Sequence, residues 1–166
     1  MFDIPEQTLP PMCVLKAPLD RRRLYATVRR MAEVAGVPCP DTALLDDRGM
    51  EALQAACLGR PGPTNILSFP SPTVSNGRTA PAGTASLYGL IASGGSGGSA
   101  EGFRGCLALS VDTLEREAFL YGQEAAEYCI RLLAHGLAHL AGHDHSPAMR
   151  ELEERLERAG RTTPAA

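Results

Sequence analysis

Apolar residues follow two different spacings along this chain. Intervals of three and four residues predict helices over residues 20–36, 50–58, 112–118, 122–140 and 146–160. Short apolar runs between turn-forming residues predict strands at 13–15, 43–45, 65–69 and 107–110. A mixture of strands and helices indicates an α+β or a mixed α/β fold, and the pattern by itself leaves the connectivity open.

Residues that begin or end helices support several of these boundaries. Asp20 and Ser146 are suited to cap the starts of helices, and Pro147 is suited to a first helical position. Gly36 and Gly142 can each end a helix in the left-handed conformation. The longest predicted helix therefore ends at a glycine turn.

Residues 71–104 interrupt the regular pattern. Ser, Gly, Thr and Pro dominate there, residues 93–99 (SGGSGGS) are typical of a flexible coil, and only 87–92 are apolar enough to order. The 166 residues suit one domain with a modest core. We therefore expect a single domain over 1–166, with an insertion at 71–104 rather than a linker between two domains.

Composition excludes several classes of protein. A hydrophobic content of 44% with 21% charged residues argues against disorder. No apolar run reaches the ~18 residues that a transmembrane helix needs, and the start, MFDIPEQTLPPM, does not resemble a signal peptide, so we expect a cytoplasmic protein with no membrane segment. The five cysteines are scattered without a C-x-x-C, which indicates neither a disulfide framework nor a thiolate zinc site.

The formal net charge of −3 gives no overall attraction for nucleic acid, so RNA binding would need a local basic patch. The first predicted helix offers one candidate. Its surface forms either a solvated helix face or a contact region for RNA, and its arginines are Arg21, Arg22, Arg23, Arg29 and Arg30.

All four histidines lie within residues 135–145, HGLAHLAGHDH. His135 and His139 are four residues apart on the predicted helix, so their rings project from one face. Because Gly142 lets the chain turn, His145 can return toward them. Three imidazoles that leave a fourth position for water are typical of a catalytic zinc site, so we predict that His135, His139 and His145 bind one Zn²⁺ per chain.

The residues around these ligands limit the chemistry. The spacing H-x3-H-x2-G-x2-H matches the metzincin peptidases, which read H-E-x-x-H-x-x-G-x-x-H, but Gly136 replaces their glutamate base. His143 is expected to pack beside the ligands or support them rather than bind metal. Asp144 could orient a ligand imidazole, act as a base, or cap the helix that begins near Ser146.

Three segments together resemble the YbeY family of metal-dependent endoribonucleases. Residues 135–145 match the family signature H-G-x-L-H-L-x-G-(Y/H)-D-H except at Ala138. A second segment, P-T-(N/D)-(V/I)-L-S-F-P, is present over residues 63–70. A third, G-D-I-V-I-S-x-D-T-x-x-x-E-A, is recognisable over residues 105–118.

This resemblance implies a single α+β domain with a small mixed sheet, and a zinc site beside residues 65–69 at the end of a central helix. It also implies a zinc-dependent endoribonuclease specific for single strands. Such an enzyme would act at the 3′ end of the small-subunit (16S) ribosomal RNA and in ribosome quality control. The implied partners are RNA, the small ribosomal subunit and its proteins.

Two positions depart from the family pattern. The family has Y-R-G shortly before P-T-N, and its arginine position is Leu58 here, with Arg60 two residues further on as a candidate to supply the cation. The family's G-D-I appears as Gly105-Cys106-Leu107 and lacks the carboxylate. Both changes affect the expected catalytic role more than the metal site.

These observations leave three hypotheses. The first is the endoribonuclease, with Arg60 and Asp144 as candidate catalytic residues. The alternative, motivated by Leu58 and Cys106, is a metal-stabilised ribosome-assembly factor that binds without cleaving. The third is a metallopeptidase, and Gly136 argues against it.

Overall fold

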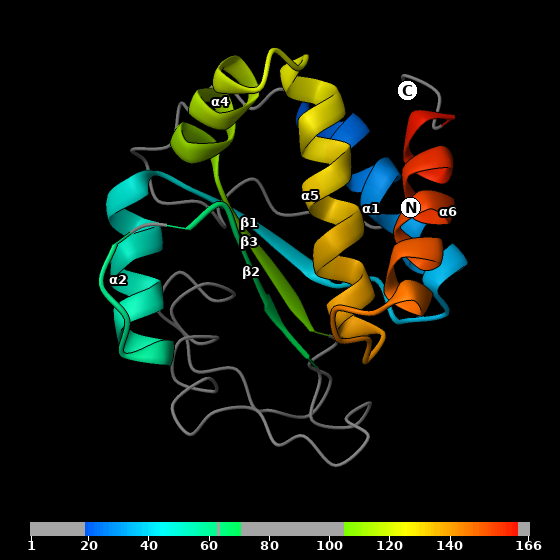
Figure 1. Ribbon diagram of the computed structural model, residues 1–166, viewed down its shortest axis with the longest axis horizontal. Coiled ribbons are helices and arrows are strands. Elements are labelled where there is room, and N and C mark those ends of the chain that lie inside the picture. Colours follow the sequence, from blue (N-terminus) through cyan, green and yellow to red (C-terminus); the bar gives the residue numbers. More distant parts are fainter. Residues whose placement is uncertain (1–18, 63, 71–104, 163–166) are drawn as a thin grey trace.

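A computed structural model describes residues 19–62, 64–70 and 105–162 of the protein (Figure 1). Within these residues the chain forms five helices and three strands, and the fold is α+β, as predicted. The predicted strand at 13–15 and the predicted insertion at 71–104 lie outside the described residues. The elements are α1 (Arg21–Ala35), β1 (Asp41–Leu45), α2 (Asp47–Leu58), β2 (Ile66–Phe69), β3 (Cys106–Ser110), α4 (Val111–Leu120), α5 (Ala125–Leu140) and α6 (Pro147–Arg161).

The three strands form a mixed sheet in the order β1-β3-β2. The central strand β3 is parallel to β1 and antiparallel to β2. All five residues of β3 are buried, which explains why its sequence is a continuous apolar run rather than an alternating one. The sheet lies between α2 on one side and α5 on the other (Figure 1).

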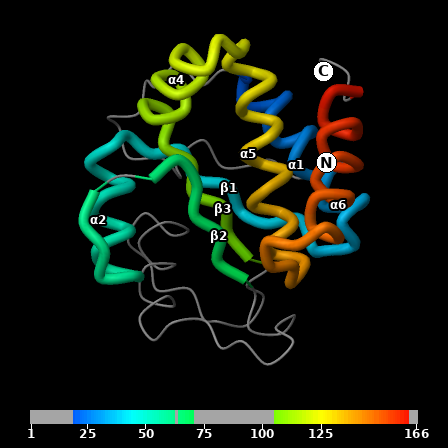
Figure 2. The backbone as a smooth tube through the Cα atoms, viewed as in Figure 1, coloured from blue at the N-terminus to red at the C-terminus, as the bar shows by residue number. Residues whose placement is uncertain are grey.

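Alternate residues of β3 face two separate cores. Leu107 and Leu109 belong to the larger core, which α1, α5 and α6 build against the sheet. Cys106 and Ala108 belong to a smaller core together with Met50 of α2 and its neighbours. The helix α5 contacts α1, α6, β2 and β3, so its position is fixed from several sides (Figure 2).

Caps account for the helix boundaries. Asp20 and Gly36 cap α1 as predicted, and Ser146 caps α6. Helix α2 begins three residues before the predicted start, because the Asp46 side chain accepts a hydrogen bond from the Gly49 amide at 2.7 Å. Helix α5 starts only at Ala125. In the described part of the chain, no helix is both long enough and apolar enough to cross a membrane.

A carboxylate network joins α2 to α4. The Asp47 side chain accepts hydrogen bonds from Ser110 Oγ at 2.8 Å, Thr113 Oγ1 at 2.7 Å and Arg116 Nη1 at 3.0 Å. The Asp47 amide in turn donates to Asp112 Oδ2 at 3.0 Å. Burial alone would raise the pKa of Asp47, but the hydrogen bonds outweigh burial and hold this pKa below its usual value.

We expect Asp47→Asn to lower the free energy of unfolding by about 1–2 kcal/mol near neutral pH, because charge-assisted hydrogen bonds are lost. A lowered folded-state pKa gives stability that is present above the unfolded value of about 3.9 and is lost as the pH falls through the folded value. The difference in the free energy of unfolding between wild type and Asp47→Asn should therefore become smaller below about pH 4. Urea unfolding at several pH values measures this difference.

Asp46→Asn is the matched control, since Asn caps helices as well as Asp does. Equal destabilisation by the two substitutions would contradict a special role for the Asp47 carboxylate.

A second carboxylate fixes the start of β2. Glu117 Oε2 accepts hydrogen bonds from Asn65 Nδ2 at 3.0 Å and from the Tyr128 hydroxyl at 2.9 Å. Burial, reinforced by Glu117, raises the pKa of Tyr128 to about 12. Asn65 and Glu117 come from two of the three family-like sequence segments. Their observed contacts place β2 against α4 and α5.

Candidate metal centre

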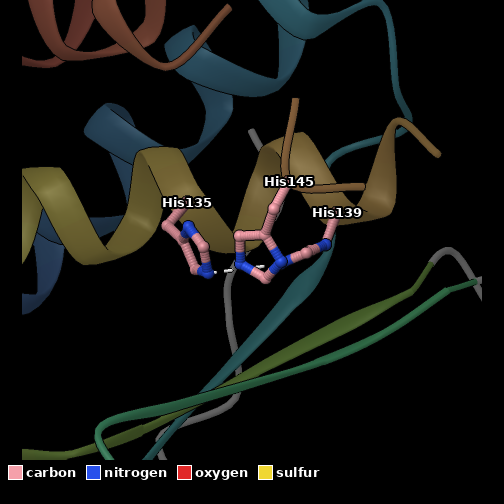
Figure 3. Close-up of side chains that lie close together, drawn as sticks. All are labelled: His135, His139 and His145. Atoms are coloured by element: carbon pink, nitrogen blue, oxygen red, sulfur yellow. Dashed lines mark hydrogen bonds between the residues drawn. The ribbon is translucent and has the colours of Figure 1, made fainter. Parts of the chain in front are cut away.

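Helix α5 and the turn after it bring three histidines together (Figure 3). His135 and His139 project from one side of α5, which ends at Leu140. Gly142 then adopts a left-handed φ of 86°, a conformation that favours glycine, and the chain turns back so that His145 faces the other two. The turn predicted from the sequence is therefore present.

The three imidazoles are close enough to share one ion. One ring nitrogen from each histidine lies within 4.8 Å of the other two. The Nε2 atoms of His135 and His139 are 3.2 Å apart. His135 and His139 are half-buried, whereas His145 is exposed, so the cluster opens to solvent on the side of His145.

The hydrogen bonds on the far side of each ring assign the protons of two histidines. His135 Nδ1 lies 2.8 Å from Glu153 Oε1, and His139 Nδ1 lies 3.0 Å from the His143 carbonyl oxygen. Both partners are acceptors, so both Nδ1 atoms donate. In the neutral rings, each Nε2 then carries a lone pair, and the two lone pairs face the same space.

Two lone pairs at this distance repel each other unless a proton or a cation lies between them. Nitrogen ligands at 2.0–2.1 Å from a tetrahedral ion are about 3.3 Å apart, which is close to the observed separation. Burial, and next the neighbouring His135, lower the pKa of His139 and favour the neutral form that metal ligation requires. The donor set therefore fits a metal ion, and the three-histidine cluster could hold one.

Glu153 contacts the three-histidine cluster, although the sequence pattern did not point to it. It lies on α6, eighteen residues after the ring that it contacts. The sequence offers no signal for this contact, because it depends on how α6 packs against α5. A carboxylate that accepts from the Nδ1 of a ligand histidine fixes its tautomer and the direction of its Nε2.

His143 and Asp144 take different positions in the turn. His143 lies outside the cluster, and it is its main-chain carbonyl that holds His139. Asp144 is exposed, and its charge slightly offsets the lowering of the His139 pKa. Capping of α6 is provided by Ser146, whose Oγ accepts from the Met149 amide at 3.2 Å. Orientation of an imidazole and base catalysis stay as predictions for Asp144.

A cavity of about 330 Å³ adjoins the histidines. Its lining comes from α5, α6 and the segment between them, and consists of His135, His145, Ser146, Met149, Arg150 and Glu153. Arg60 is exposed just after the C-cap of α2 and is not part of this lining. The composition of the cavity therefore does not support Arg60 as the catalytic cation, and this role stays a prediction.

The two departures from the family pattern occupy different environments. Leu58 is the last residue of α2 and is 46% exposed. Cys106 is fully buried in β3, and burial, with the nearby Asp41, raises the pKa of its thiol to about 12. Cys106 is therefore a neutral core residue rather than a nucleophile.

Gly136 lies against the sheet. A Cβ atom at this position would be 2.7 Å from Ile66 Cδ1, 2.8 Å from Leu107 Cδ2 and 3.1 Å from Ser68 Oγ. No larger side chain fits there without movement of these neighbours. At the position that carries the base in the metzincin pattern, a glutamate would therefore start against the sheet, and Ile66 and Leu107 would have to move to admit it.

The fold and the site together define a class of protein. It is a small α+β protein in which the end of one helix and the following turn present three imidazoles as a candidate metal site.

Comparisons with known proteins identify the particular family. The family described as endoribonuclease YbeY matches residues 25–162. The endoribonuclease YbeY of Nitratidesulfovibrio vulgaris is 41% identical over 126 residues, which cover 76% of this chain and 74% of that protein. The endoribonuclease YbeY of Oleidesulfovibrio alaskensis is 37% identical over 141 residues, 84% of this chain and 82% of that protein. The chain therefore belongs to the endoribonuclease YbeY family, a family of RNA-cleaving hydrolases, which confirms the resemblance.

Proposed function

We propose that this protein is a zinc-dependent endoribonuclease specific for single-stranded RNA. Its proposed substrate is the 3′ end of small-subunit ribosomal RNA, and its proposed setting is the maturation and quality control of ribosomes in the cytoplasm. The observation that carries this proposal is the convergence of three imidazoles in a chain of the endoribonuclease YbeY family.

In the proposed site, His135, His139 and His145 hold the zinc ion. When bound, zinc supplies a Lewis acid that lowers the pKa of a water molecule to about 7 and polarises a phosphoryl oxygen. Glu153 and the His143 carbonyl accept hydrogen bonds from the Nδ1 atoms of His135 and His139, which leaves the two Nε2 atoms directed at the ion. Asp144, exposed next to His145, is a candidate to hold a proton during the reaction, and Arg60 is a second candidate catalytic residue.

The direct test compares wild type and His135→Ala, purified in the same way, on a labelled fragment of the 3′ end of small-subunit ribosomal RNA. We expect wild type to contain one zinc per chain and to cut the single strand, but not the same fragment in a duplex. His135→Ala should contain no zinc and should leave the single strand intact. Equal cleavage by both proteins would reveal a contaminating nuclease and would remove the support for this function.

The same experiment addresses the alternative, a ribosome-assembly factor that binds RNA without cutting it. Leu58 and the buried Cys106 favour this alternative, because the family pattern has an arginine and an aspartate at these positions. Zinc-loaded wild type that binds the fragment and leaves it intact would establish the alternative in place of the nuclease.

We expect Glu153→Ala to weaken zinc binding by about 10- to 100-fold, because His135 loses the carboxylate that fixes its tautomer. Glu153→Gln should have a smaller effect, since its amide oxygen can still accept from His135 Nδ1. Competition with a coloured chelator measures both dissociation constants.

Glu154→Gln, an exposed change at the next residue of α6, is the matched control. Zinc affinities that are equal in Glu153→Ala and Glu154→Gln would contradict the role assigned to Glu153.

A further inference from the structure

One side chain with a permanent positive charge lines the cavity beside the three histidines. Among its lining residues in the described chain, Arg150 is the only arginine or lysine. Arg150 is the fourth residue of α6, and its amide donates to the Ser146 carbonyl at 3.2 Å, so helix geometry fixes its backbone. Arg150 therefore lines the cavity together with His135 and His145.

The guanidinium of Arg150 is available for a ligand. None of the ion pairs observed between described residues includes it, although five other arginines take part in such pairs. The carboxylate that shares the cavity, Glu153, is hydrogen-bonded to His135 instead. Arg150 is also exposed, so a ligand can reach its side chain from solvent.

An arginine in this setting is suited to a phosphate. Guanidinium groups bind phosphate oxygens through two parallel hydrogen bonds. A protein with a net charge of −3 needs local cations to hold a polyanion, and this cation lies next to the candidate metal site. A cavity of about 330 Å³ is at the lower end of the range for small-ligand sites, which suits one nucleotide unit.

We propose that Arg150 binds a phosphate of the RNA strand in the cavity next to His135 and His145. This inference rests on the proposed function and adds to it a substrate-binding residue. It places the phosphate contact on α6, whereas Leu58 and Arg60 lie at the end of α2, outside the cavity lining.

The test compares wild type, Arg150→Ala, Arg150→Lys and Arg155→Ala, all loaded with zinc. Arg155 is the matched control, because it is an exposed arginine of the same helix outside the cavity lining. The substrate is the labelled single-stranded fragment. The readouts are zinc content, kcat/KM, and the affinity for the fragment as a function of salt concentration.

We expect Arg150→Ala to lower kcat/KM by about 10- to 100-fold with unchanged zinc content. The slope of the logarithm of affinity against the logarithm of salt concentration should decrease by about 0.7, the value for one lost contact to a single strand. Arg150→Lys should keep the salt slope but recover only part of kcat/KM, since lysine lacks the two parallel hydrogen bonds. Arg155→Ala should leave both quantities close to those of wild type.

Equal effects of Arg150→Ala and Arg155→Ala would overturn the inference, and so would loss of zinc in Arg150→Ala. If wild type binds the fragment without cleaving it, the nuclease proposal fails, and the affinities still decide the role of Arg150. A weaker affinity in Arg150→Ala alone then supports the inference, and equal affinities overturn it. No binding by wild type would overturn both proposals.

Discussion

Zinc content should fall from about one ion per chain to near zero in His139→Ala, and RNA cleavage should disappear with it. His139 provides one of the two facing Nε2 atoms, and its ring is held by the His143 carbonyl. Loss of a direct ligand should weaken binding by more than the ~100-fold upper range for a supporting partner. Elemental analysis and cleavage of the single-stranded fragment measure the two effects.

His145→Ala is the companion variant, because His145 is exposed and its loss leaves the core intact. Circular dichroism should show that both variants keep their helices. His143→Ala is the matched control, since only the main chain of His143 contacts the cluster and the substitution leaves that carbonyl in place. Zinc at wild-type stoichiometry in His139→Ala and in His145→Ala would show that the ion binds elsewhere.

Gly136→Val should lower the free energy of unfolding by about 3 kcal/mol and shift α5 away from the sheet. Even the first added carbon would contact Ile66 and Leu107 at less than 3.0 Å. Gly136→Ala should cost less, because it adds one carbon and gains up to about 1 kcal/mol of helix propensity. Urea unfolding gives the free energies.

The effect of Gly136→Val should also appear at the site, since residue 136 lies between His135 and His139, the two candidate ligands on α5. We expect weaker zinc binding together with the lower stability. Ile66→Val removes the Cδ1 atom that lies nearest to the added carbon. A double-mutant cycle should therefore show that Ile66→Val recovers part of the loss caused by Gly136→Ala. Strict additivity of the two changes would contradict the contact.

Local sequence patterns predicted most of the elements because their signals lie within a few residues. Helix α1 has both predicted caps. The turn after α5 occurs at Gly142, because glycine adopts a positive φ without steric strain. The start of α2 was predicted too late, since the first turn of that helix is polar and Asp46 rather than apolar spacing defines it. Apolar periodicity does not detect such a turn.

The sequence by itself determined most of the described helices and strands, the family, and the convergence of His135, His139 and His145. These features depend on short-range geometry: four residues along a helix and one glycine turn set where the imidazoles point.

Only the tertiary structure decided what surrounds that cluster. The packing of α6 on α5 brings Glu153 to His135 and places Arg150 on the wall of the cavity. The packing of α2 near α4 likewise brings Asp47 to Thr113, 66 residues further along the chain. Such contacts depend on how two helices are oriented in a shared core, and the spacing of residues along the sequence does not predict that orientation.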